Sequence, residues 1–171
     1  QGIQFAHERG KKVYVAVNIF AHNQDLHKLP GYLKELASLN VDGLIISDPG
    51  VLAIAKETVP ELAVHLSTQA NVTNWASVRF WQEQGVQRVI LAREVSLAEI
   101  AKMKDKTQIE LEAFVHGAMC MAYSGRCLLS SFFTGRSANK GACTHPCRWR
   151  YQLVEQTRPG EYMPIIEEQR G

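Results

Sequence analysis

Long apolar runs are absent from this sequence. No stretch reaches the roughly 18 consecutive apolar residues that a membrane-spanning helix needs, so no membrane partner is expected. An excess of one charge is also absent, because the formal net charge is only +2. That balance excludes a strong general preference for acidic partners. With 46% hydrophobic residues in a chain of 171, the composition is that of a globular protein with a sizeable core.

The chain also lacks an initiator methionine and a signal peptide. It opens with QGIQFAHERGKK, a pattern typical of a helix that is already under way, with no cap before it. We therefore expect a fragment of a longer protein.

Cysteine is absent from residues 1–119, and all four cysteines lie between residues 120 and 147. A disulfide framework usually spreads its bridges through a small, loop-rich chain, whereas this chain has long apolar segments that can form a core unaided. The clustering therefore indicates metal ligation or redox chemistry.

Short β-branched runs alternate with amphipathic stretches along the first two thirds of the chain. The pattern predicts strands at Val13–Val17, Gly43–Ile46, Leu62–Leu66, Arg88–Leu91 and Ile109–Val115. It predicts helices at Asp25–Leu39, Pro49–Glu57, Asn71–Gln84 and Ser96–Lys104, with Pro30 marking a first turn or a split in the first of these. Such alternation predicts an α/β fold with a parallel sheet and right-handed crossovers.

The sheet could be open and doubly wound, or part of a (β/α)₈ barrel. No glycine-rich phosphate-binding fingerprint follows any strand, which weakens the first alternative. Polar residues follow the strands instead, as in the active-face loops of a TIM barrel. They are Asn18, Asp48, Ser67–Gln69, Arg93–Glu94 and His116. A full barrel takes about 250 residues, so we expect a partial TIM-like barrel over residues 1–119. A Cys-rich cluster-binding segment, residues 120–171, then continues the same domain, and barrel strands are missing at both ends.

The four cysteines have the spacing C-x6-C-x15-C-x3-C, formed by Cys120, Cys127, Cys143 and Cys147. Four thiolates suit an iron–sulfur cluster or tetrahedral zinc. Structural zinc usually takes two tight pairs, and only the second pair here is tight. Reduced structural cysteines are a third alternative, disfavoured because the segment is rich in glycine turns.

Acidic residues are absent between Glu112 and Glu155, where basic residues are frequent. Cations there could offset the negative charge of a cluster, or bind phosphate and nucleic acid. The candidate RNA-binding side chains are Arg126, Arg136, Lys140 and Arg148, with aromatic residues available for stacking at Tyr123, Phe132, Phe133 and Trp149. A merely solvated basic loop is the alternative.

Hydrolytic motifs such as HExxH and GxSxG are absent. Glu112 and His116, four residues apart at the end of the last predicted strand, would point to the same side and could act as an acid/base pair. A strand-end glutamate paired with an arginine is the alternative. His65 and Gln69 close another strand and would face the same mouth as substrate-binding residues, although a lone strand histidine is often a core residue.

The stretch Glu112-Ala-Phe-Val-His-Gly-Ala-Met-Cys120, followed by Gly125-Arg-Cys-Leu-Leu-Ser130, resembles the signature of the U32 "collagenase-like peptidase" family. It joins an acidic residue, two glycines and two cysteines within 19 positions, so a chance match is very improbable. The resemblance continues through VNIFAHN, LIISDPG, HLSTQAN, VILARE and GACTHPCRW, and so covers essentially the whole chain.

The resemblance implies a TIM-like barrel and a [4Fe–4S] cluster on Cys120, Cys127, Cys143 and Cys147. It implies hydroxylation chemistry rather than proteolysis, with prephenate as a source of the hydroxyl group or a co-substrate. Among the family's branches the chain is most similar to the one that supports 5-hydroxyuridine formation at the tRNA wobble position. We therefore expect a cytoplasmic protein that acts on tRNA, with an electron donor or partner protein still to be identified. The alternatives are a U32 peptidase and an RNA-binding module with a structural metal.

Overall fold

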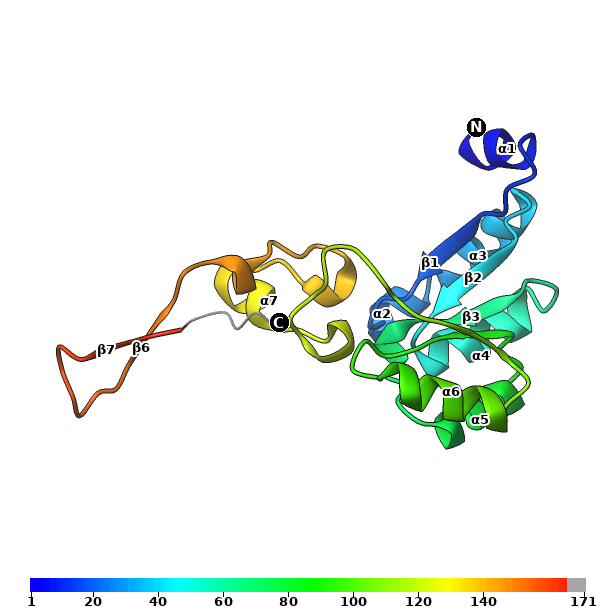
Figure 1. Cartoon of the computed structure of the whole chain (residues 1–171). Coiled ribbons are helices and arrows are strands. Elements are labelled where there is room, and N and C mark those ends of the chain that lie inside the picture. The colour runs from blue at the N-terminus through cyan, green and yellow to red at the C-terminus, as the bar shows by residue number, and fades with distance from the viewer. Residues whose placement is uncertain (166–171) are drawn as a thin grey trace. The chain divides into compact units, whose positions relative to one another are not determined.

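Five short strands pair side by side in chain order, all of them parallel (Figure 1). They belong to a computed structural model that describes residues 1–165, in which contacts divide the chain into the units Gln1–Arg126 and Cys127–Gly171. The strands of the first unit are β1 (Tyr14–Val17), β2 (Gly43–Ile46), β3 (Val64–Leu66), β4 (Arg88–Ile90) and β5 (Glu110–Glu112). Its helices are α1 (Gly2–His7), α2 (Asn23–Leu26), α3 (Leu29–Ser38), α4 (Pro49–Thr58), α5 (Trp75–Glu83) and α6 (Leu97–Lys106), with short 3₁₀ turns η1 (Thr68–Ala70) and η2 (Tyr123–Gly125).

One face of the sheet carries the hydrophobic core. Every second residue of a strand points to this face, and strand pairing places apolar residues of neighbouring strands side by side there, for example Ile46 beside Leu66. The buried side chains of α3 to α6 pack in the same cluster, among them Leu33, Val51, Val78 and Met103. Helices that follow parallel strands in chain order lie on one face because each crossover is right-handed.

The opposite face of the sheet carries charged and polar side chains beside the apolar Ile45 and Ile90. Register places Ile45, His65, Arg88 and Glu110 in one row across β2 to β5. The Arg88 guanidinium contacts Glu110 at 2.6 Å and Glu112 at 3.3 Å, and the pairing with Glu110 raises the pKa of Arg88.

Three helices begin at the side-chain caps that their sequences favour. Asp48 accepts a hydrogen bond from the Val51 amide at 2.9 Å, and Asn74 accepts one from Ser77 at the same distance. Ser96 caps α6 in the same way. Such caps satisfy backbone amides that have no partner within the helix, which is why the helices begin there.

The second unit consists of short elements. They are α7 (Leu129–Thr134), the 3₁₀ turns η3 (Ala138–Lys140) and η4 (Pro146–Arg148), and an antiparallel hairpin of β6 (Gln152–Val154) and β7 (Tyr162–Pro164). Ser130 is fully buried and joins α7 to the following loop, because its hydroxyl contacts the Thr144 hydroxyl at 3.0 Å and accepts from the Thr144 amide at 3.1 Å.

The predicted parallel sheet alternating with helices is confirmed. The expectation that Pro30 marks a first turn or a split is confirmed as well: the predicted helix is split into α2 and α3, and Pro30 lies in the first turn of α3, where its missing amide costs nothing. The end of the last strand was predicted wrongly. The last strand ends at Glu112 rather than Val115, because its pairing with β4 stops where Ile90 meets Glu112. Among the described residues, no helix is long and apolar enough to cross a membrane.

Candidate functional site

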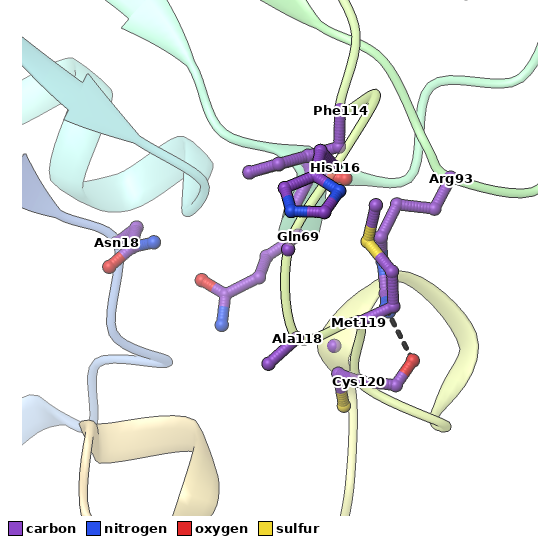
Figure 2. Close-up of a pocket in the computed structure, with 11 residues that line it drawn as sticks. Asn18, Gln69, Arg93, Phe114, His116, Ala118, Met119 and Cys120 are labelled. Atoms are coloured by element: carbon purple, nitrogen blue, oxygen red, sulfur yellow. Dashed lines mark hydrogen bonds between the residues drawn. The ribbon is translucent and has the colours of Figure 1, made fainter.

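A cavity of about 270 Å³ lies beyond the carboxyl ends of the strands in the first unit (Figure 2). Parallel strands all end at the same edge, so the residues that follow them come together there. Asn18 follows β1, Thr68 and Gln69 follow β3, and Arg93 follows β4. The segment after β5 supplies the remaining wall, from Phe114 through His116 to Cys120.

Two candidate residues lie elsewhere. Glu112 ends β5 and is paired with Arg88. This pairing of a strand-end glutamate with an arginine was the alternative to an acid/base role. The expectation that Glu112 and His116 share one side of a strand fails, because β5 ends before His116. His65 is buried in β3, with its ring 4.4 Å from that of Tyr14, and it is not among the residues that line the cavity. Burial, assisted by the charge of Arg88, lowers the pKa of His65, so the imidazole is neutral at pH 7.

Arg93 holds the chain at Cys120. Its guanidinium donates one hydrogen bond to the carbonyl oxygen of Cys120 and another, at 2.7 Å, to that of Ala122 (Figure 2). Hydrogen bonds from a charged donor are the stronger kind, and a guanidinium presents its donors in a fixed plane. Arg93 therefore fixes the backbone that carries the Cys120 thiol at the cavity wall.

Glu94 and Asn71 hold the next turn of the same segment through Ser124, which is fully buried and has a left-handed backbone with φ 47°. The Ser124 amide donates to Glu94 at 2.8 Å, and the Ser124 hydroxyl lies 3.0 Å from Glu94 Oε2 and 2.7 Å from Asn71 Oδ1. Desolvation alone would raise the pKa of Glu94, but the hydrogen bonds from Ser124 outweigh it, so the pKa is lowered. A residue held in this backbone region needs such contacts to offset its strain.

Arg126 holds the end of the segment that begins at Cys120. Its guanidinium donates to the carbonyl oxygen of Gln69 from Nε at 3.3 Å and from Nη2 at 3.1 Å, and it lies 5.7 Å from the centre of the Phe20 ring. The sequence marked Arg126 as a candidate RNA-binding residue, whereas the structure gives it a tethering contact within the first unit. Sequence reasoning missed the roles of Arg93, Asn71 and Ser124, and the polar Arg93-Glu94 pair after β4 was the only signal for them.

The other three cysteines lie in the second unit. Cys127 Sγ accepts a hydrogen bond from the Leu129 amide at 3.4 Å, and Cys143 Sγ accepts one from the His145 amide at 3.3 Å. All four cysteines are free thiols. Within residues 1–165, no group of three or more His, Cys, Asp or Glu side chains is gathered as a metal site. The donor chemistry nevertheless fits an iron–sulfur cluster, because backbone amides directed at sulfur are typical of such sites.

The basic candidates of the second unit lie in the same stretch of the chain as these cysteines. Arg136 follows α7 and is exposed, Lys140 ends η3, and Arg148 ends η4. Exposed aromatic rings lie in the same unit, with the Phe133 ring 5.1 Å from Phe132 and 5.9 Å from Trp149. Positive charge and exposed rings together suit a single-stranded nucleic acid.

The model of peptidase family U32 matches residues 1–171, the whole chain. The chain belongs to this family. It is 50% identical over 155 residues to tRNA hydroxylation protein P1 of Bacillus subtilis, covering 91% of this chain and 37% of that protein. It is 51% identical over 155 residues to tRNA hydroxylation protein P of Escherichia coli, covering 90% of this chain and 34% of that protein. This U32 chain therefore spans little more than a third of these relatives.

The fold of this U32 chain also has a solved counterpart. The structure of a U32 peptidase aligns with a TM-score of 0.56 at 20% identity, covering 65% of this chain and 48% of that one. At this level of identity, the likeness supports the α/β architecture alone.

Proposed function

We propose that the protein containing this chain is an RNA-modifying enzyme that hydroxylates a tRNA uridine, giving 5-hydroxyuridine at the wobble position. The observation that carries the proposal is the cavity, where Cys120 shares a wall with polar side chains from the ends of three strands. It occurs in a chain about half identical to two tRNA hydroxylation proteins. The proposal includes prephenate as the source of the hydroxyl group, an unidentified electron donor and a cytoplasmic location.

The proposal assigns a [4Fe–4S] cluster to Cys120, Cys127, Cys143 and Cys147. Four free thiols, two of them accepting backbone amides, support the assignment. A bound cluster would supply one-electron redox chemistry. The chain's own residues would do the rest: Arg93 positions Cys120, and His116, in the cavity wall, holds substrate or moves a proton.

Two further features belong to the same proposal. Arg136, Lys140 and Arg148 would contact the RNA backbone, in a stretch with no acidic residue between Glu112 and Glu155. The five-stranded sheet would be part of a (β/α)₈ barrel in the longer protein. Its strand order, without any crossing or reversal, is what such a barrel requires.

Mass spectrometry of tRNA nucleosides tests the proposal. Cells that lack the full-length protein should lose 5-hydroxyuridine and regain it when the wild-type protein is supplied. A His116→Gln variant should bind tRNA with unchanged affinity but restore little of the modification, which distinguishes an enzyme from a binding module. An unchanged 5-hydroxyuridine level after deletion, or cleavage of gelatin by the purified protein, would contradict the proposal and favour the peptidase alternative.

A further inference from the structure

One buried polar atom in the cavity wall has no partner. Gln69 Oε1 is enclosed, yet among the described residues nothing donates a hydrogen bond to it. Burying such an acceptor unpaired destabilises the folded state, and native proteins rarely keep one without a reason. Because Gln69 lines the cavity, and its amide extends into it on the side of Asn18 (Figure 2), a bound molecule can supply the missing donor.

The Gln69 backbone is held in place by hydrogen bonds within the first unit. Its amide donates to the Ser67 hydroxyl at 3.4 Å, and its carbonyl oxygen accepts both hydrogen bonds from Arg126. The side chain passes beside Gly125, where a Cβ would lie 3.5 Å from Gln69 Cγ, an ordinary van der Waals distance. Fixing the backbone limits the positions that the side-chain amide can take at the cavity wall.

The rest of the cavity suits one flat ring. Its volume of about 270 Å³ lies just below the range of ordinary ligand pockets, so it accommodates a single base rather than a folded strand. Phe114 and His116 supply rings in the wall, and Ala118 and Met119 supply apolar surface. Enzymes that modify bases take the target out of its stack and place it in a pocket of this kind.

We propose that Gln69 binds the Watson–Crick edge of the target pyrimidine, with its Oε1 accepting the base N3–H and its amide nitrogen donating to a neighbouring carbonyl oxygen. This inference rests on the function proposed above and adds how the base is recognised. An amide pairs with the imide edge of uracil through two hydrogen bonds, as amides pair with other bases. That pairing leaves the C5–C6 edge of the ring unblocked, which hydroxylation at C5 requires.

The first test uses wild-type full-length protein and two anticodon-loop RNAs that differ only at the target, uridine or N3-methyluridine. The methyl group removes the donor and leaves C5 unchanged. We expect modification of the methylated RNA to fall about tenfold or more, the usual effect of losing a two-bond contact. Equal modification of both RNAs would overturn the edge contact while leaving the hydroxylase proposal intact, whereas no modification of either would contradict that proposal itself.

The second test compares Gln69→Met with Gln82→Met, which makes the same change at an exposed position of α5. Gln69→Met should keep its iron content and its affinity for tRNA, and should unfold at the same temperature or higher, because it removes an unpaired buried acceptor. Its hydroxylation of the uridine RNA should nevertheless fall about tenfold. Wild-type activity in Gln69→Met, or an equal loss of activity in Gln82→Met, would overturn the assignment.

Discussion

Glu94 accepts a hydrogen bond from the Ser124 amide at 2.8 Å, and its second oxygen lies 3.0 Å from the Ser124 hydroxyl. This contact joins the end of β4 to the turn that follows Cys120. Since Ser124 is fully buried and has a left-handed backbone, the contact determines where the segment between Cys120 and Arg126 can lie. The Glu94 carboxylate therefore contributes to the stability of the folded chain and to the position of the segment that follows Cys120.

The pH dependence of unfolding should report this carboxylate. The folded-state pKa of Glu94 is lowered from its ordinary value of 4.5, so its contribution is present above pH 4.5 and is lost as the pH falls through the lower folded value. Glu94→Gln should remove that part of the acid destabilisation. The measurement is urea unfolding of wild type and variant between pH 6 and pH 3. Parallel stability curves over this range would contradict the role of Glu94.

Arg93 should affect the cluster more than the fold. Arg93→Met removes the two hydrogen bonds that hold the carbonyl oxygens of Cys120 and Ala122. We expect a chelator to remove iron from the variant about tenfold faster than from wild type, the equivalent of losing one charged hydrogen bond. Arg79→Met, on α5 where Arg79 lies over Trp75, is the matched control. Equal rates of iron loss in all three proteins would show that Arg93 does not position Cys120.

The free energy of unfolding should also depend on pH through His65. Burial lowers its pKa in the folded state below the ordinary 6.5, so its contribution to stability is full above pH 6.5 and declines as the pH falls below that value. His65→Gln should flatten the dependence of the free energy of unfolding on pH just below 6.5, while tRNA modification is retained because His65 does not line the cavity. Loss of modification with unchanged stability would instead make His65 a substrate-binding residue.

Arg136 should bind RNA mainly through charge. It is exposed, in a stretch without acidic residues. Arg136→Gln should weaken tRNA binding and lower the slope of log affinity against log salt by about 0.7–0.9, the value for one phosphate contact. Fluorescence anisotropy at several salt concentrations measures this slope, with Arg79→Gln as the control. A slope equal to that of wild type would remove Arg136 from the RNA-binding surface.

The sequence predicted the repeating architecture well because hydrophobic periodicity and helix caps are local signals. Strand β2 has its predicted bounds, and Asn74, within the range predicted for the helix, caps α5. The end of β5 was not predictable in this way, because Val115 is apolar but 90% exposed, with no strand to pair with beyond Glu112. Exposure of single side chains is no more local: Trp75, in a predicted helix, is 38% exposed and lies beneath the charges of Arg79 and Lys106.

The site was predicted only in part for a related reason. Gln69 and His116 follow strands, and this position alone indicates the common edge of a parallel sheet. Arg93 and Ser124 act through contacts between segments about 30 residues apart, which no local pattern encodes. The pairing of Glu112 with Arg88 likewise depends on strand register, which only the folded sheet defines.

The most direct test of the account is the iron and acid-labile sulfide content of the full-length protein, purified without oxygen and measured with its visible spectrum. A cluster held by the four cysteines predicts about four irons and four sulfides per chain. It also predicts their loss in Cys120→Ser and in Cys143→Ser alike, because four thiolates would hold one group. Zinc in place of iron, no metal at all, or full iron retention in either variant would contradict the account.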